Sequence, residues 1–453
     1  MSSYSFRSMV KKYVNSSFVL IFATILALIA ANSPWGDLYR RVWEMPVSIS
    51  VGPFNLFSHH GETLSLMDFI NDFLMAVFFF SVGLEIKREM LVGELSSLKK
   101  ALLPIIGACG GMLVPVIVFY LFCPSDAIMQ RGMAIPMATD IAFSLGVLSI
   151  FGRRVPIGLK VFLAALAVAD DLGGIIVIAL FYSSAIDWSY LGISLLAVLL
   201  LLIGNHRLWR AKTFYIGAGI VVWYMLLNSG IHATIAGVIV AFCVPTSLCH
   251  GTAYYIERIR ENINLFPIIR VSRKHPKPIL LSNEDISVLK SIESASDHLI
   301  SPLQDLEDGL RRPINYFIIP VFAFANAGID FSHMTPGNLF SGIGLAVFMG
   351  LLIGKVAGVF SFSWLAIRSG LVTMPVGSNW RSFASVCMLC GIGFTVSMFI
   401  ADLSYDNFGL LGRDMLNDAK LGILCGSVLS GFIGFLLLRR YLPAEGTLSE
   451  AER

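Results

Sequence analysis

The sequence predicts an all-α polytopic membrane protein, and its composition and its apolar runs support this prediction. Of its 453 residues, 56% are hydrophobic and only 14% are charged, whereas soluble domains have about 25% charged residues. Mean hydropathy is +0.76, and long apolar runs follow one another along nearly the whole chain. The net charge of +3 is too small to indicate nucleic-acid binding. We therefore expect one membrane transport domain, 1–453, embedded in a lipid bilayer.

About twelve transmembrane helices account for these runs, because a helix needs ~20 residues to cross the hydrocarbon layer. The expected spans are 15–31, 66–85, 101–122, 132–151, 158–182, 189–204, 213–227, 231–245, 314–329, 344–367, 382–403 and 419–438. The third to fifth spans run opposite to the tenth to twelfth. This relation predicts an inverted repeat.

A short polar segment between the first two spans has a different pattern. Residues 47–56 alternate apolar and polar around Gly52 and Pro53, which predicts an exposed β-hairpin within 45–58. A two-stranded hairpin is only marginally stable alone. We therefore expect it to pair with another surface, and a homodimer formed through 45–58 would supply one.

Lysine and arginine predict the orientation, because they gather in cytoplasmic segments. With the N-terminus inside, most of the 33 Lys and Arg residues lie in inside segments. Both termini are then cytoplasmic, and so is the long polar loop at 246–313. Its mixed charges, prolines and serines predict a partly disordered segment.

The seven cysteines lie mostly within apolar runs. Cys387 and Cys390 form a C-x-x-C pair, but a structural zinc site needs four ligands. We interpret both as small packing residues and expect no resident cofactor.

Charged residues inside the expected spans are the main functional signal, because each costs at least ~2.5 kcal/mol at the bilayer centre. These residues are Asp72, Asp140, Asp170, Asp171 and Lys355. Asp170 and Asp171 interrupt the apolar run 161–182, which predicts an ion or proton site there. The alternative is a structural acid pair inside a large soluble protein. A lysine buried opposite aspartates predicts an ion pair.

Two expected spans also carry points where a helix should break. Pro136 precedes Thr139 and Asp140 in one, and the other contains the glycine-rich segment 391–395. Such breaks in two halves predict broken helices that cross at mid-membrane and line a binding site. Asp140 would then offset positive helix ends, and Lys355 would offset negative ones.

Three other classes of protein fit the sequence less well. An intramembrane aspartyl protease needs a Gly-x-Gly-Asp string, but here Gly173 and Gly174 follow the acids. A channel would need a selectivity filter, and nothing resembles one. A sodium-coupled symporter of organic anions could share the architecture but would not need the aspartate pair. We therefore expect a transporter and not an enzyme.

Several specific strings occur in one order along the chain. They are MAVFF (75–79), VGLEIKRE (82–89), ATDIAF (138–143), DDLG (170–173), HAT (232–234), FAFANAG (322–328), GK (354–355) and CGIGFT (390–395). In these strings the chain resembles the NhaA family of bacterial sodium/proton antiporters, which are inverted-repeat transporters.

The resemblance implies a function and a set of site residues. The function is export of Na⁺, and of Li⁺, in exchange for H⁺ across the bacterial inner membrane. Exchange would be electrogenic and activated at alkaline pH, and it would control intracellular pH and sodium. Asp171 would be the main sodium ligand, with Asp170 beside it and Thr139 at the break. Asp140 and Lys355 would lie where the broken helices cross, with Asp72 as a supporting acid on the ion path.

The resemblance also implies positions linked to activation at alkaline pH. They are Glu85, Arg88, Glu89, His232 and Glu307. The alternatives are a span-end hydrogen bond for His232 and a charged interfacial cap for 85–89. The chain departs from the family's Lys-Pro-Leu-Gly in reading Lys355-Val356-Ala357-Gly358. It also has Arg311-Arg312-Pro313 near Glu307, where the family commonly has His-Pro-Trp.

Overall fold

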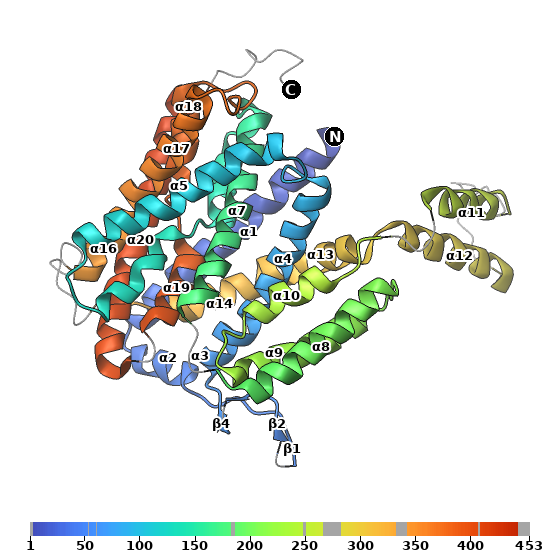
Figure 1. The fold of residues 1–453 in the computed structure, drawn as a ribbon, viewed down its shortest axis with the longest axis horizontal. Helices are drawn as coiled ribbons and strands as arrows, with labels where there is room; N and C mark the ends of the chain where they lie inside the picture. Colours follow the sequence, from blue (N-terminus) through green and yellow to red (C-terminus); the bar gives the residue numbers. More distant parts are fainter. Residues whose placement is uncertain are drawn as a thin grey trace, which may run out of the picture.

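The computed structural model describes residues 3–52, 54–59, 61–182, 186–247, 251–265, 282–331, 342–405 and 408–442, without the side chains of 3–15, 51, 54 and 410. Figure 1 shows the arrangement, in which long helices lie side by side and short strands extend from one end. In the first half the helices are α1 (Ser3–Ala31), α2 (Gly36–Trp43), α3 (Leu66–Asp68), η1 (Phe69–Leu74), α4 (Met75–Val92), α5 (Leu98–Phe122), η2 (Met129–Met137), α6 (Ile141–Ile150), η3 (Gly152–Arg154), α7 (Ile157–Phe181), α8 (Trp188–His206) and α9 (Lys212–Ser229).

The second half continues with α10 (Ile235–Cys243), α11 (Thr252–Leu265), α12 (Asn283–Leu299), α13 (Pro302–Pro313), η4 (Ile314–Ile318), α14 (Ile319–Asn326), α16 (Gly342–Met349), η5 (Gly350–Lys355), α17 (Val356–Arg368), α18 (Trp380–Leu389), α19 (Phe394–Tyr405) and α20 (Gly409–Tyr441). Segments η1, η4 and η5 are π-helical, and η2 and η3 are 3₁₀ helices.

The prediction of a multi-pass helical protein is confirmed. Among the described residues, 7 helices are long and apolar enough to cross a membrane, or up to 9 if each of two bent pairs forms one span. Several expected spans are shorter than predicted. The segment 231–245 contains only the nine-residue α10, and 314–329 corresponds to η4 and α14.

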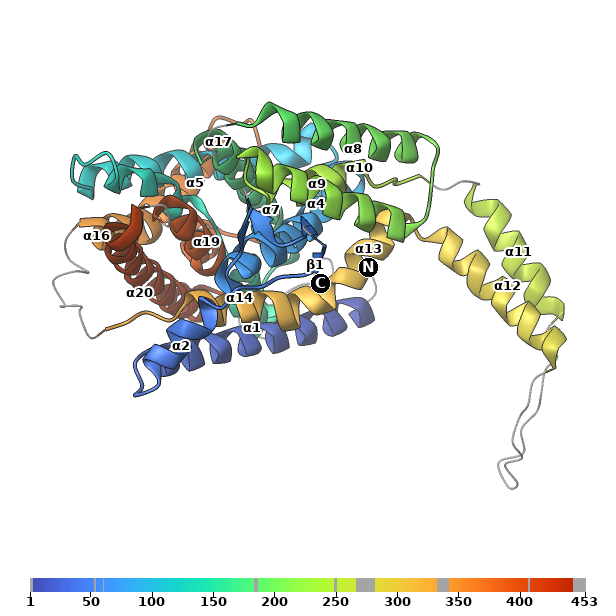
Figure 2. The same cartoon turned by 90° about the horizontal axis from the view of Figure 1, so that it is seen from below.

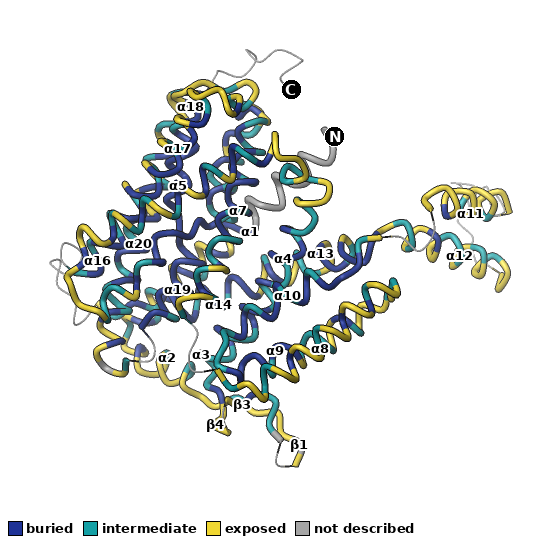
Figure 3. Tube along the Cα trace, viewed as in Figure 1, coloured by how far each residue is buried: buried dark blue, intermediate teal, exposed yellow. Residues whose placement is uncertain are grey.

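Close helix crossings hold the bundle together, and glycine makes them possible. A Cβ on Gly358 of α17 would collide with the carbonyl oxygen of Gly110 on α5, and one on Gly237 of α10 would collide with that of Ala76 on α4. Helices α7 and α19 lie deep inside, while much of α8 is exposed (Figure 3). The exposed face of α8 is apolar, with Leu195 70% exposed, as expected of a helix that faces lipid.

The predicted hairpin is present and a second one follows it. Strands β1 (Ser50–Val51) and β2 (Phe54–Asn55) pair antiparallel, with Ser50 opposite Asn55; Pro53 of the predicted turn lies outside the described residues. Strands β3 (Ser58–His59) and β4 (Glu62–Thr63) form the hairpin that the sequence did not predict. Buried Phe57 lies between the two hairpins and contacts the rings of Phe69, Phe73 and Trp223, which anchors this ribbon to the bundle.

The segment 246–313 is more ordered than the sequence predicts, although 248–250 and 266–281 lie outside the described residues. Helices α11 and α12 pack together and stand apart from the bundle (Figure 2). A capping box starts α12, in which Ser282 and Asp285 satisfy each other's backbone N–H groups. Arg210 donates to the carbonyls of Asp297, His298 and Ile300 and so ties the end of α12 to the α8–α9 connection. The sequence predicted partial disorder in this segment; helices form in parts of it, and at α12 the capping box outweighs the weak apolar periodicity.

Candidate functional site

Helix α7 carries the two adjacent aspartates through the middle of the bundle (Figure 1). Both are buried, with Asp170 2% and Asp171 5% exposed. Neighbouring residues on an α-helix point about 100° apart, so the two carboxylates face different neighbours. Asp170 faces the break that follows η2.

Asp170 is held by a lysine and a hydroxyl from two other segments. Lys355 Nζ lies 2.7 Å from Asp170 Oδ2, and Thr139 Oγ1 donates to the same oxygen at 2.8 Å. Lys355 is the last residue of the π-helical segment η5 and is 0% exposed. It also donates to the carbonyl oxygen of Met137 at the end of η2. The predicted ion pair therefore forms, with Asp170 as the partner.

The two predicted breaks touch each other directly. Residues 138–140 separate η2 from α6, and residues 390–393 separate α18 from α19 with a bend of 43°. The backbone N–H of Asp140 donates to the carbonyl of Ile392 at 2.6 Å. Thr139 Oγ1 donates across the contact to the carbonyl of Cys390 at 3.1 Å. These bonds satisfy part of the backbone that the breaks leave without helical partners.

Asp140 caps both helices that start at this contact. Its Oδ1 accepts the N–H of Phe143 in α6 at 3.1 Å. Its Oδ2 accepts the N–H of Thr395 in α19 at 3.1 Å and the hydroxyl of Thr395 at 2.6 Å. A carboxylate placed at two helix N-termini offsets their positive ends, as the sequence predicts. The carbonyl contact of Lys355 supplies the opposite charge at a helix C-terminus.

Two oxygens at the pair have no hydrogen-bond donor. Asp170 Oδ1 and Asp171 Oδ1 are buried and unpartnered, and a buried polar atom left so costs several kcal/mol in an apolar setting (about 2–7). Hard cations take oxygen ligands, so these atoms suit a cation. Across the described residues, no three His, Cys, Asp or Glu side chains are grouped to hold a metal ion. A complete ligand set there would need neutral oxygens such as that of Thr139.

The positions that the resemblance associates with pH regulation fall into two places. Arg88 Nη2 lies 2.9 Å from Glu89 Oε1, and Arg88 Nη1 lies 3.2 Å from Glu307 Oε1. The second ion pair joins α4 to α13. Burial raises the pKa of the Glu307 carboxyl to about 7, and Arg88 offsets this rise only in part. Glu85 lies one turn before Glu89 on the same helix. These four residues therefore form one cluster.

His232 is separate from this cluster. Lys87, next to Arg88, donates to the carbonyls of Phe242 at 2.7 Å and Val244 at 2.5 Å, at the C-terminal end of α10. His232 precedes the start of the same helix and so lies at its other end. Its backbone carbonyl accepts the N–H of Ile235 at 3.1 Å.

Asp72 lies in η1. The same helical turn contributes Asn71 to a group of polar side chains that was not predicted from the sequence. The backbone carbonyl of Asp72 accepts the indole N–H of Trp223 at 3.2 Å. Next to it, Asn71 donates to Asp402 of α19, and Asn326 of α14 donates to Asn71 at 2.9 Å. Asp402 falls at the end of the expected span 382–403. The sequence signal for this group was Asp402, an aspartate within an apolar span. Because it lies near the end of the span, it was not recognised as buried.

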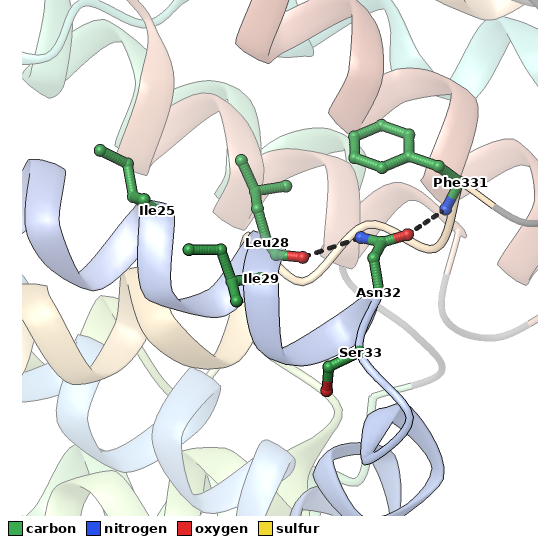
Figure 4. A pocket seen from close by; sticks show the side chains of 6 residues that line it. All are labelled: Ile25, Leu28, Ile29, Asn32, Ser33 and Phe331. Atoms are coloured by element: carbon green, nitrogen blue, oxygen red, sulfur yellow. Dashed lines mark hydrogen bonds between the residues drawn. The ribbon is translucent and has the colours of Figure 1, made fainter.

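Two hollows among the described residues lie away from the aspartate side chains. A hollow of about 430 Å³ lies beside the end of α1 and is lined by Ile25, Leu28, Ile29, Asn32, Ser33 and Phe331 (Figure 4). Asn32 joins its two sides by donating to the carbonyl of Leu28 and accepting the N–H of Phe331. A second, narrow hollow is lined by Phe79, Ile175, Ile178, Thr234 and Ile235. Ile175 is one turn from Asp171 on α7.

Buried carboxylates that meet a buried lysine where two broken helices touch define a class of protein. Ionisable residues inside apolar helices mark ion pathways, and broken helices form the ion sites of secondary transporters. The fold and site are those of a secondary ion transporter.

Comparison with known proteins identifies the family. The family described as Na⁺/H⁺ antiporter 1 matches residues 7–438. A protein of Phocaeicola vulgatus named Na(+)/H(+) antiporter NhaA is 51% identical over 444 residues, which cover 98% of this chain and 97% of the relative. Proteins of the same name from Bacteroides fragilis and Bacteroides thetaiotaomicron are 50% and 51% identical, each over 95% of this chain and 96% of the relative. The chain belongs to the Na⁺/H⁺ antiporter 1 family.

Proposed function

We propose that the chain performs the Na⁺/H⁺ exchange of its family at Asp170 and Asp171. The observation that carries this assignment is the pair of buried carboxylates, each with one oxygen that has no hydrogen-bond donor. Asp171 is the main Na⁺ ligand, because Lys355 and Thr139 already hold Asp170. Thr139 is placed to add a neutral oxygen when its hydroxyl turns from Asp170.

Exchange follows from competition for the same oxygens. Na⁺ binds the ionised carboxylates, and protons that bind them expel the cation. Because the two carboxylates are adjacent, they titrate as a pair. Na⁺ entry weakens the hold of Asp170 on Lys355, and the ion pair forms again when the cation has left and Asp170 is ionised. Movement at the contact of the two breaks then exposes the pair to one side of the membrane at a time.

The finer architecture completes this mechanism. We propose twelve spans related by an inverted repeat. This proposal is supported by the contact of the two breaks, in which Thr139 bonds Cys390 and Asp140 bonds Ile392. The arginine and lysine distribution supports cytoplasmic termini and an inner-membrane location. More than one proton per cation makes the exchange electrogenic, and Li⁺, another small hard cation, is a further substrate. The hairpins, at the end of the bundle opposite the termini (Figure 1), form the contact surface of a homodimer.

Activation at alkaline pH is assigned to the cluster around Glu307. As pH rises through about 7, Glu307 becomes ionised and strengthens its pairing with Arg88. This change tightens the contact between α13 and α4. Because α4 continues from η1 along the ion path, the contact is placed to control access to the site.

Exchange in everted membrane vesicles tests the assignment. Addition of Na⁺ at alkaline pH is expected to dissipate a proton gradient, as read by a pH-sensitive dye, and parallel assays with Li⁺ and K⁺ give the ion preference. Asp171→Asn is expected to abolish the response, while Asp297→Asn, at an exposed position on α12, leaves it unchanged. Near-normal exchange by the Asp171→Asn protein would contradict the proposal.

A further inference from the structure

A second polar group lies inside the bundle, apart from the aspartate pair. Asn71 of η1, Asn326 of α14 and Asp402 of α19 come from three segments far apart in sequence and are 5%, 0% and 8% exposed. Asn71 donates to Asp402 Oδ2, and Asn326 Nδ2 donates to Asn71 Oδ1 at 2.9 Å. We refer to these three residues as the amide–carboxylate cluster.

One oxygen of this cluster has no donor. Asn326 Oδ1 is buried and unpartnered, while the nitrogen of the same amide bonds Asn71 and the carbonyl of Phe322. The amide group therefore faces the cluster and brings an unused acceptor to it. An acceptor that has no donor, and whose amide is linked through Asn71 to a carboxylate, is suited to a cation and not to an anion.

The backbone around the cluster favours the same sign of charge. Asn326 is the last residue of α14, and a helix C-terminus carries a partial negative charge. Asn71 lies in a π-helical turn, a feature that often marks functional positions because it redirects side chains. Lys355 of the aspartate site also lies in a π-helical segment.

Aromatic rings separate the cluster from the aspartate site. Phe399 is one turn before Asp402 on α19, and its ring lies 5.6 Å from that of Phe79 and 6.3 Å from that of Phe322. All three rings are buried, and Phe79 also lines the narrow hollow beside Ile175 and Ile178 of α7. The order is therefore Asp171, the narrow hollow, the ring layer (Phe79, Phe322 and Phe399), and then the amide–carboxylate cluster.

The cluster lies toward the end of the bundle that carries the hairpins. Segment η1 follows β4 through α3, and Figure 1 shows α3 and β4 together at that end. Helix α19 starts at the break contact and ends at Tyr405, so Asp402 lies past the ring layer and closer to the hairpins.

From this placement we propose that Asn71, Asn326 and Asp402 form a second, transient Na⁺ site on the hairpin side of the ring layer. Asp402 supplies a carboxylate oxygen, Asn326 supplies its amide oxygen, and Asn71 orients the carboxylate. The site holds a cation between the bulk solution at the hairpin end and the aspartate pair. The proposal rests on the proposed exchange at Asp170 and Asp171, because a relay site needs a destination.

Exchange measured separately from each side of the membrane tests this site. The full-length protein is reconstituted in one orientation into liposomes, and Na⁺ is added at the hairpin side or at the opposite side while lumenal pH is recorded. Asp402→Asn is expected to raise the apparent KM for Na⁺ at the hairpin side about tenfold, the loss that removal of one charged ligand produces. The apparent KM at the opposite side and kcat are expected to change less than twofold.

Two further variants keep the test informative if Asp402→Asn does not fold. Asn326→Leu removes the amide oxygen and is expected to raise the same one-sided KM, whereas Asn326→Asp keeps an oxygen there and is expected to retain a low KM. Ser404→Ala is the matched control, because Ser404 is buried on the same helix and bonds the carbonyl of Ile400 and the hydroxyl of Tyr182, neither of which belongs to the cluster.

Three results would overturn the second site. The first is an unchanged KM for Na⁺ in both Asp402→Asn and Asn326→Leu. The second is an equal rise in KM at the hairpin side and at the opposite side of the membrane. The third is a KM in Asn326→Asp as high as that in Asn326→Leu. An equal rise would mean that the cluster acts only by packing the helices. Failure of the aspartate assignment is distinct, because it appears as normal exchange in Asp171→Asn whatever the Asp402 variant does.

Discussion

Lys355 Nζ lies 2.7 Å from Asp170 Oδ2, and neither side chain is exposed to solvent. The pair joins η5 to α7 inside the bundle. Removal of one partner from a buried ion pair leaves an uncompensated charge, which costs about 3–5 kcal/mol. The contact therefore links the stability of the fold to the charge state of the proposed ion site.

Lys355→Ala is expected to destabilise the protein and weaken exchange. The free energy of unfolding should fall by about 3–5 kcal/mol, because Asp170 loses its cation. The double variant Asp170→Asn with Lys355→Met removes both charges and should be more stable than Lys355→Ala. Thermal unfolding of the purified protein measures both, with exposed Lys290→Ala on α12 as the control. Equal stability of Lys355→Ala and the wild type would show that the ion pair does not stabilise the fold.

Thr395→Val is expected to loosen the contact between the two breaks. The substitution keeps the shape but removes the 2.6 Å hydroxyl bond to Asp140, and hydrogen bonds to charged groups contribute about 1.5–3 kcal/mol. Unfolding should require correspondingly less free energy, and the rate of exchange should fall. Thr24→Val on α1 is the matched control, since that hydroxyl bonds only the local carbonyl of Leu20 among the bonds described. Equal losses in the two variants would show that Asp140 gains nothing specific from Thr395.

Gly358→Ala is expected to displace Lys355 without touching it. The new Cβ would collide with the carbonyl oxygen of Gly110, so α17 must move away from α5, and Lys355 lies three residues earlier. Overpacking of this kind costs about 1–3 kcal/mol. Gly174→Ala on α7 is the control, because a Cβ there meets nothing within 4 Å. We expect a lower melting temperature and slower Na⁺ exchange for Gly358→Ala alone, and unaltered exchange would contradict this coupling.

The sequence indicated the residues that meet at this contact, because charge inside an apolar run is a strong local signal. Asp170, Asp171 and Lys355 were visible for that reason, and Pro136 and the glycines at 391–393 predicted the breaks. The partner of Lys355 was not predictable from sequence, because Asp170 and Asp171 are neighbours that only the rotation of α7 distinguishes. Structure assigns the lysine to Asp170.

Other features escaped prediction because their signals depend on tertiary contacts. Asp402 lies near the end of an expected span, where a charge resembles an interfacial residue, and only the folded structure shows that it is buried and bonds Asn71. Helix α12 has a mixed polar sequence, and its cap and its bonds to Arg210 define it. Among the described residues 7 to 9 helices are candidate spans, and short helices such as α10 fall below the length of a continuous span.

Glu307→Gln is expected to change the pH dependence of both stability and exchange. Burial raises the pKa of Glu307 from 4.5 to about 7, so the folded state favours the protonated form. That stabilisation is complete below pH 4.5 and is lost as pH rises through 7. The glutamine variant stays neutral, so it should gain stability relative to the wild type across this window.

Melting temperatures from pH 4 to pH 8 and the pH profile of Na⁺ exchange measure this effect. The difference in melting temperature between Glu307→Gln and the wild type should grow as pH rises from 4.5 to 7. The rise of exchange with pH should become shallower or shift, since Arg88 no longer gains an ionised partner. Glu284→Gln, at an exposed position on α12, should follow the wild type throughout. A melting-temperature difference that does not vary with pH would show that Glu307 does not titrate in this window, and an unshifted exchange profile would exclude it from activation.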